Sequence, residues 1–230
     1  VPVEIETGQL ASERYRLPTP DPSRPARVAN TVAKIVQHFE WQGPIGCTFP
    51  SVIRDGIVYT AANVDQAWLG TDGRALLERK TGRPVLLIND ADAAGMAELE
   101  FGAGRGHQGV VMMLTFGTGI GSALFANRQL VPNTELGHLQ IRGQDAEWRA
   151  SDRARQAKNL SWKKWARNVN EYLGWIERLF SPDLIIIGGG VSKKHEKYLP
   201  LLKTQAQVVP AQFLNDAGSV GAALAAKTLL

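Results

Sequence analysis

Apolar and polar positions follow two different periods along the chain. Short apolar runs bounded by turn residues predict strands at 3–7, 10–17, 45–49, 85–88, 109–116, 120–126 and 184–190, and a hairpin at 52–60 around Asp55-Gly56. Apolar residues three or four positions apart predict helices at 28–39, 72–82, 91–102, 161–180 and 219–230. Asp21 or Ser23 is expected to cap the first helix. Because strands and helices interleave, the pattern favours an α/β architecture over a β-sandwich.

Composition is that of an ordinary globular protein. The chain has 230 residues, 44% of them hydrophobic, which is enough for one large core or two smaller ones. Its apolar runs are too short to cross a bilayer, and the first residues, VPVEIETG, lack the basic and apolar regions of a secretion signal. A single cysteine, Cys47, indicates a reducing compartment. We therefore expect a cytoplasmic protein with no membrane partner.

The net charge of +4 is unevenly distributed. One stretch, named the basic run here, is typical of a solvated helix face, and the alternative is a surface that binds anions. Both interpretations are open from the sequence. The basic run consists of Arg149, Arg153, Arg155, Lys158, Lys163, Lys164 and Arg167.

Two glycine-rich segments follow predicted strands. The first, 117-GTGIG-121, lies between two strands and is named the glycine turn here; the second is 188-GGG-190. Without Cβ atoms the backbone can approach a ligand closely and direct its N–H groups at phosphate oxygens, although each segment is equally compatible with a plain tight turn. Neither segment matches a P-loop or a dinucleotide-binding fingerprint.

Polar residues near strand ends are candidates for chemistry on hydroxyl and phosphoryl groups. Asp90 follows an apolar strand, and a carboxylate there can accept the proton of a hydroxyl that attacks a phosphoryl group. The alternative is that Asp90 or Asp92 caps the next helix. Glu135 and His138 are spaced to hold the hydroxyls of a sugar, with metal ligation as the rival interpretation. Asn63 has an amide that suits hydroxyl recognition, or is a turn residue.

Six motifs in order give the chain a family resemblance. They are TFPS, GIVYTAANV, INDADAAGMAE, LTFGTGIGSAL, NTELGH and IIIGGGVS. Together they resemble the ROK family of bacterial sugar kinases and repressors, and most of all its polyphosphate-using glucokinase branch. The resemblance implies an α/β fold of the actin-like, hexokinase-like (ribonuclease H-like) type, with the substrates in a cleft between two domains. The domains would be residues 1–90 with 216–230, and residues 91–215.

The resemblance also implies a reaction. A terminal phosphoryl group would pass from polyphosphate or ATP, together with Mg²⁺, to the 6-hydroxyl of glucose or mannose; a glucokinase that uses only ATP is the alternative. Asp90 would be the general base. The implied sugar ligands are Asn63, Asn89, Asp90, Glu135, His138 and Glu147. The implied donor-binding residues are Thr115, Gly117, Thr118, Gly119, Gly121, Gly188, Gly189 and Gly190, and the basic run would form part of a polyphosphate track.

Two departures from the family pattern lead to further expectations. Many ROK members carry a cysteine-histidine zinc cluster after the E-x-G-H motif, but residues 139–150 contain no cysteine, so no structural zinc is expected. The glycine-rich D-x-G-G-T phosphate loop expected before residues 3–7 is not in this sequence. A sugar-responsive repressor would need a helix-turn-helix, which the sequence does not contain, so no nucleic-acid partner is expected. Two interpretations of the Trp-rich helix 161–180 are open: it forms the interface of a homodimer, or it is buried within the chain.

Overall fold

The computed structural model describes all residues 1–230 and divides into two compact units. Unit 1 comprises Val1–Ala97 and Ala217–Leu230, and unit 2 comprises Glu98–Asp216. The division falls within helix α3 (Asp90–Glu100). None of the helices combines the length and the apolar character that a membrane span requires.

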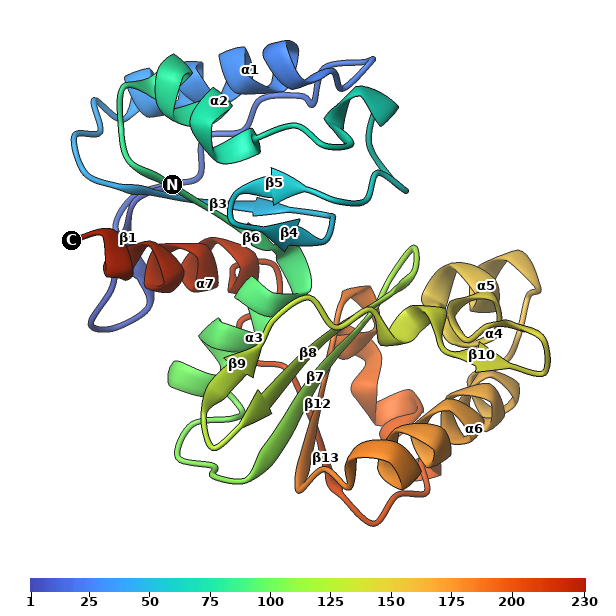
Figure 1. Cartoon of the computed structure of the whole chain (residues 1–230). Helices are drawn as coiled ribbons and strands as arrows, with labels where there is room; N and C mark the ends of the chain where they lie inside the picture. Colours follow the sequence, from blue (N-terminus) through green and yellow to red (C-terminus); the bar gives the residue numbers. More distant parts are fainter. The chain divides into compact units, whose positions relative to one another are not determined.

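Unit 1 packs helices around a two-stranded parallel sheet (Figure 1). Its elements besides α3 are β1 (Val3–Glu4), β2 (Gln9–Leu10), α1 (Pro25–His38), β3 (Ile45–Phe49), β4 (Ile53–Arg54), β5 (Ile57–Val58), the 3-10 helix η1 (Gln66–Trp68), α2 (Gly73–Thr81), β6 (Val85–Asn89), α7 (Ala217–Ala226) and the 3-10 helix η5 (Lys227–Leu229). Strands β3 and β6 run parallel, with Phe49 opposite Asn89. The C-terminal helix α7 packs against both strands, so the end of the chain completes unit 1.

Glycines allow α7 to approach the sheet and α3 closely. A Cβ atom on Gly46 of β3 would collide with the backbone carbonyl of Ala222, and a Cβ atom on Gly221 would collide with that of Ala93. Larger residues at these two positions would push α7 away from β3 and from the start of α3. The same contact fixes the first turn of α3, where Asp90 lies.

Unit 2 is built on a five-stranded mixed sheet. Its elements are β7 (Val110–Phe116), β8 (Ile120–Ala126), β9 (Gln129–Val131), the 3-10 helix η2 (Leu136–His138), β10 (Gln140–Ile141), β11 (Gln144–Asp145), α4 (Glu147–Ala150), α5 (Asp152–Ala157), α6 (Trp162–Phe180), β12 (Leu184–Gly188), the 3-10 helices η3 (Gly190–Lys197) and η4 (Leu199–Leu201), and β13 (Gln207–Pro210). The strand order is β13-β12-β7-β8-β9, in which β13, β12 and β7 pair in parallel, whereas β8 pairs antiparallel with both β7 and β9.

Helix α6 buries its apolar stripe against the sheet of unit 2. Trp165 and Tyr172 are fully buried and meet Phe116 edge to face, with ring centroids 5.7 and 6.3 Å apart. Phe116 ends strand β7, directly before the glycine turn. The stripe of α6 is therefore intrachain core, and it supports the strand that carries the glycine turn.

The N-terminal segment differs from its expected structure. Strands β1 and β2 are two residues long each, and no strand extends over 11–17, because only Val3–Leu10 and Glu4–Gln9 pair across the turn. Neither predicted cap of α1 is used: Arg24 occupies the N-cap position without a side-chain hydrogen bond, and Pro25 begins the helix. The predicted hairpin at Asp55-Gly56 is confirmed, with positive φ angles of 52° and 84° that this tight turn requires.

Candidate functional site

Asp90 begins helix α3 directly after strand β6 in unit 1. Its Oδ1 accepts a hydrogen bond from the Ala91 amide at 2.8 Å, and the side chain keeps solvent-accessible surface. Protein atoms around the carboxylate displace part of its hydration, and this desolvation raises the pKa of Asp90 above its usual range against the opposing backbone hydrogen bonds. An accessible carboxylate with a raised pKa is suited to general-base chemistry.

Asn89 makes the larger share of the hydrogen bonds at the start of α3. Its Oδ1 accepts from the amides of Ala91 at 2.8 Å and Asp92 at 3.2 Å, and its Nδ2 donates to the Ser51 carbonyl at 3.1 Å. Asn89 is only 6% exposed. A buried amide therefore fixes the helix start and the backbone of the neighbouring Asp90. The remaining predicted sugar ligand of unit 1, Asn63, is exposed in the loop before η1.

The glycine turn closes the hairpin between β7 and β8 in unit 2. Thr115 and Gly121 face each other across the two strands. Inside the turn the Gly117 amide donates to the Gly119 carbonyl at 3.0 Å, while the amides of Thr118 and Gly119 have no partner in the chain. Two N–H groups of the turn are therefore available to an anion.

Glu147 lies against the glycine turn. Its Oε2 accepts a hydrogen bond from the Ile120 amide at 3.2 Å, and a Cβ atom on Gly119 would collide with the same oxygen. Glycine at 119 is thus needed for the carboxylate to reach the turn. The start of α5 also contacts the turn, because the Arg153 amide donates to the Gly117 carbonyl at 3.0 Å.

Strand β8 also fixes the segment that carries Glu135 and His138. The Ser122 hydroxyl donates to the Thr134 carbonyl at 2.5 Å and accepts from the Leu136 amide at 3.0 Å. Gly137 packs so closely on the backbone of β8 that a Cβ atom there would collide with a carbonyl. Glu135 is half-buried and His138 exposed, so both predicted ligands stay accessible on a fixed backbone.

His138 is surrounded by carboxylates. Its Nδ1 lies 2.7 Å from Oδ2 of Asp145, and this hydrogen bond is the main reason why the pKa of His138 is raised. Desolvation opposes the shift, while the charges of Glu147, Asp145 and Glu135 add to it. Asp145 is not among the residues predicted from the sequence, although Glu147, two positions further on, is; in the structure Asp145 is the acid that hydrogen-bonds to the imidazole.

Replacing Asp145 by asparagine should lower the pKa of His138 toward its usual value. The raised pKa means that protonation of His138 stabilises the fold at low pH, and that this stabilisation is lost as the pH rises through the raised pKa. The variant should therefore lose stability relative to the unmodified protein mainly on the acidic side. NMR titration of the imidazole protons measures the shift, and the three other histidines serve as internal controls. An unchanged His138 titration would contradict the assigned role of Asp145.

The three glycines of 188-GGG-190 have different surroundings. Gly188 ends β12 beside Thr115, and a Cβ atom there would collide with the Met113 side chain. Gly189 has a φ of 79°, and its Cβ would collide with the backbone of Phe116. Gly190 has no atom within 4 Å of its Cβ position. Packing explains the first two glycines, and only Gly190 faces open space.

Comparisons with known proteins agree on one family. Residues 3–147 match the ROK family. A polyphosphate glucokinase of Mycobacterium tuberculosis is 48% identical over 97% of this chain and 84% of its own length. Among solved structures, the inorganic polyphosphate/ATP-glucomannokinase of Arthrobacter sp. strain KM has a TM-score of 0.93 at 48% identity, over 99% of this chain and 93% of the other. The ROK family glucokinase of Streptomyces griseus, solved with glucose and AMPPNP, has a TM-score of 0.83 at 25% identity, over 98% of this chain and 94% of the other.

Proposed function

The chain belongs to the ROK family and has its actin-like, hexokinase-like sugar-kinase fold, and from this premise we propose that it phosphorylates glucose at the 6-hydroxyl. Inorganic polyphosphate or ATP is the proposed phosphoryl donor, and mannose a second acceptor. The observation that carries the proposal is the accessible carboxylate of Asp90, whose pKa is raised. The relatives whose names state these activities align with nearly all of this chain.

Asp90 acts as the general base in this proposal. Its carboxylate accepts the proton of the 6-hydroxyl as the oxygen attacks the terminal phosphoryl group. Asn89 positions Asp90 through the hydrogen bonds at the start of α3. The hydroxyls of the sugar are held by the predicted ligands, namely Asn63, Asn89, Glu135, His138 and Glu147.

The donor is held at the glycine turn. The free amides of Thr118 and Gly119 bind oxygens of the transferred phosphoryl group, where negative charge must be stabilised as the bond to the donor breaks. Both amides are fixed by the hairpin before the donor arrives, so their hydrogen bonds cost little reorganisation. The remaining donor residues predicted from the sequence, including Gly190, stay assigned to the phosphate chain or to the nucleoside of ATP.

The side chains present fit a donor-bound Mg²⁺ better than a metal cage made of protein. No group of three or more His, Cys, Asp or Glu side chains is arranged to hold a metal ion. Mg²⁺ commonly keeps several waters and binds through the phosphates of its substrate, which requires few protein ligands. When bound in this way, the ion neutralises charge on the donor phosphates.

The test is an assay of glucose 6-phosphate formation with polyphosphate and with ATP as separate donors, and with glucose and mannose as separate acceptors. We expect turnover of glucose with both donors. Activity with ATP alone would support the alternative of an ATP-only glucokinase, and the absence of sugar phosphorylation with either donor would refute the proposal. A homodimer stays a prediction, which the molar mass in solution would test.

A further inference from the structure

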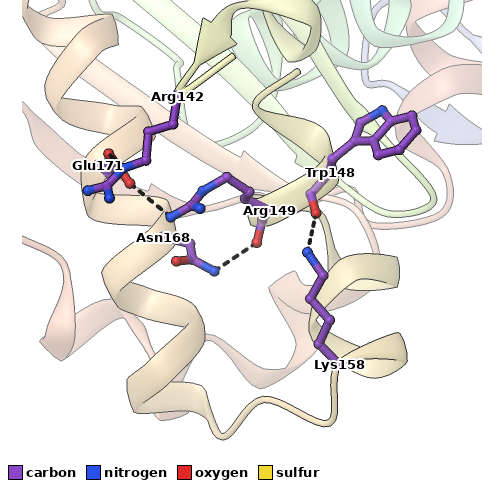
Figure 2. Close-up of polar contacts among 6 residues, drawn as sticks. All are labelled: Arg142, Trp148, Arg149, Lys158, Asn168 and Glu171. Carbon is purple, nitrogen blue, oxygen red and sulfur yellow. Dashed lines mark hydrogen bonds and ion pairs between the residues drawn. The ribbon is translucent and has the colours of Figure 1, made fainter. Parts of the chain in front are cut away.

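Several cations of the basic run are already engaged within unit 2. Arg149 donates to Glu171 at 3.2 Å, and the same carboxylate binds Arg142 at 2.6 Å. The Lys158 ammonium donates to the Trp148 carbonyl at 2.8 Å. Figure 2 shows Arg142 and Arg149 directed at Glu171, with the Trp148 indole pointing away from these contacts. Arg149 and Lys158 are therefore used in holding α4, α5 and α6 together.

Arg155 is engaged as well. Its guanidinium binds Oδ1 of Asp152 at 2.7 Å and lies over the Trp162 ring at 4.2 Å from the centroid. The second oxygen of Asp152 accepts a hydrogen bond from the side-chain Nε2 of Gln156 at 2.7 Å. Both oxygens of Asp152 thus take part in contacts within α5, and no ion pair joins Asp152 to the adjacent Arg153. The exposed cations of the basic run whose side chains form neither an ion pair nor a hydrogen bond are Arg153, Lys163, Lys164 and Arg167.

Arg153 is fixed to the glycine turn by its backbone. Its amide donates to the Gly117 carbonyl at 3.0 Å. Arg153 lies in the short helix α5, which Ser151 caps by accepting a hydrogen bond from the Ala154 amide at 3.1 Å. No atom lies within 4 Å of the Cβ position of Gly117. The Arg153 backbone is therefore held beside the turn, its guanidinium is exposed and unpaired, and the space around the Cβ position of Gly117 is open.

The charge of Glu147 makes a cation at this place necessary for binding an anion. The Glu147 carboxylate accepts a hydrogen bond from the Ile120 amide, next to the two free amides of the turn. Like charges a few ångströms apart repel, so a phosphate at the turn would be opposed by this carboxylate unless a positive group offsets it. A guanidinium matches phosphate geometry and keeps its charge throughout the physiological pH range.

We propose that Arg153 is a donor-binding residue, whose guanidinium binds the non-transferred phosphates of the phosphoryl donor beside the glycine turn. This inference rests on the proposed function. It assigns the binding of donor phosphates to one residue of the basic run, whose backbone is held beside the glycine turn. Polyphosphate offers only phosphates for recognition, so the contact matters for its binding even more than for that of ATP, which also presents a nucleoside.

Replacing Arg153 by glutamine should raise the KM for polyphosphate about tenfold, equivalent to about 1.4 kcal/mol, with the KM for glucose within about twofold. Arg153→Lys should recover part of the loss because it restores the charge without the guanidinium fork. The matched control is Arg142→Gln: this arginine is also exposed, but Glu171 already binds it. Equal effects of the two glutamine variants would indicate a general effect of net charge and overturn the proposal.

Calorimetry with tripolyphosphate separates this inference from the proposed function. The unmodified protein should bind tripolyphosphate, and Arg153→Gln should weaken the Kd about tenfold even if no sugar is phosphorylated. Inactivity of the unmodified protein with either donor would refute the proposed function alone. Failure of the unmodified protein to bind tripolyphosphate, or a Kd unchanged by Arg153→Gln, would refute the role of Arg153.

Discussion

Replacing Asp90 by asparagine is expected to lower the kcat for glucose phosphorylation by about a hundredfold to ten-thousandfold, the range that a positioned general base contributes. Asparagine has nearly the same shape and keeps a side-chain oxygen that can accept the Ala91 amide, as Asp90 does. The KM for glucose should therefore stay within about threefold. Initial rates at saturating donor, with glucose varied, measure both quantities.

The same substitution should leave the protein as stable as before or more stable. Desolvation raises the pKa of Asp90, so the folded state holds its proton more tightly than the unfolded state. Such a group favours folding at low pH, and this contribution is lost as the pH rises through the raised pKa. At neutral pH the ionised carboxylate is thus a cost, which asparagine removes. A loss of activity with an unchanged or higher Tm would separate catalysis from folding.

Asp72→Asn is the matched control for this experiment. Asp72 is exposed and caps α2 by accepting from the Ala75 amide at 2.8 Å, and asparagine is an equally good cap. This variant should keep both kcat and Tm. Near-normal turnover of Asp90→Asn would refute the base assignment, and so would an equal loss in both variants.

The pH dependence of kcat/KM is a second test of the role of the Asp90 carboxylate. Only ionised Asp90 can accept a proton, so kcat/KM should fall as the pH is lowered through the raised pKa of this group. The midpoint should lie above that of an ordinary aspartate. In Asp90→Asn the residual activity should lose this acid limb.

Local sequence was sufficient to predict most of the elements and the position of the glycine turn. The period of apolar residues reports burial of a strand or helix face, and it predicted β3, β6 and α6 within one or two residues. Asp55-Gly56 predicted its hairpin because few residue pairs adopt two successive positive φ angles. These features depend on neighbours along the chain.

Side-chain partners could not be predicted, because they depend on contacts between distant segments. Nothing local distinguishes Asp145 from Glu147, yet one holds His138 and the other holds the glycine turn. Whether Arg149 is engaged in an ion pair depends on Glu171, which lies on α6. The sequence therefore predicted a set of candidate ligands, and the fold determined which of them are free to meet a substrate.

Alanine at position 189 is expected to destabilise the protein by about 2–4 kcal/mol. Gly189 has a φ of 79°, where a side chain costs roughly 1 kcal/mol or more, and its Cβ would collide with the Phe116 backbone, where overpacking costs about 1–3 kcal/mol. Phe116 leads directly into the glycine turn, so relief of the collision would displace the donor-binding amides as well. Thermal unfolding should show a Tm lower by roughly 5–15 °C.

Gly190→Ala separates packing from donor binding at the adjacent position. Its φ is not positive and no atom lies within 4 Å of the Cβ position, so stability should change by less than about 0.5 kcal/mol. If the Gly190 backbone faces the nucleoside of ATP, the new methyl group should raise the KM for ATP and leave that for polyphosphate unchanged, because polyphosphate has no nucleoside. A Gly189→Ala variant as stable as Gly190→Ala would contradict the packing explanation, and an equal rise of both KM values in Gly190→Ala would place this residue at the phosphates instead.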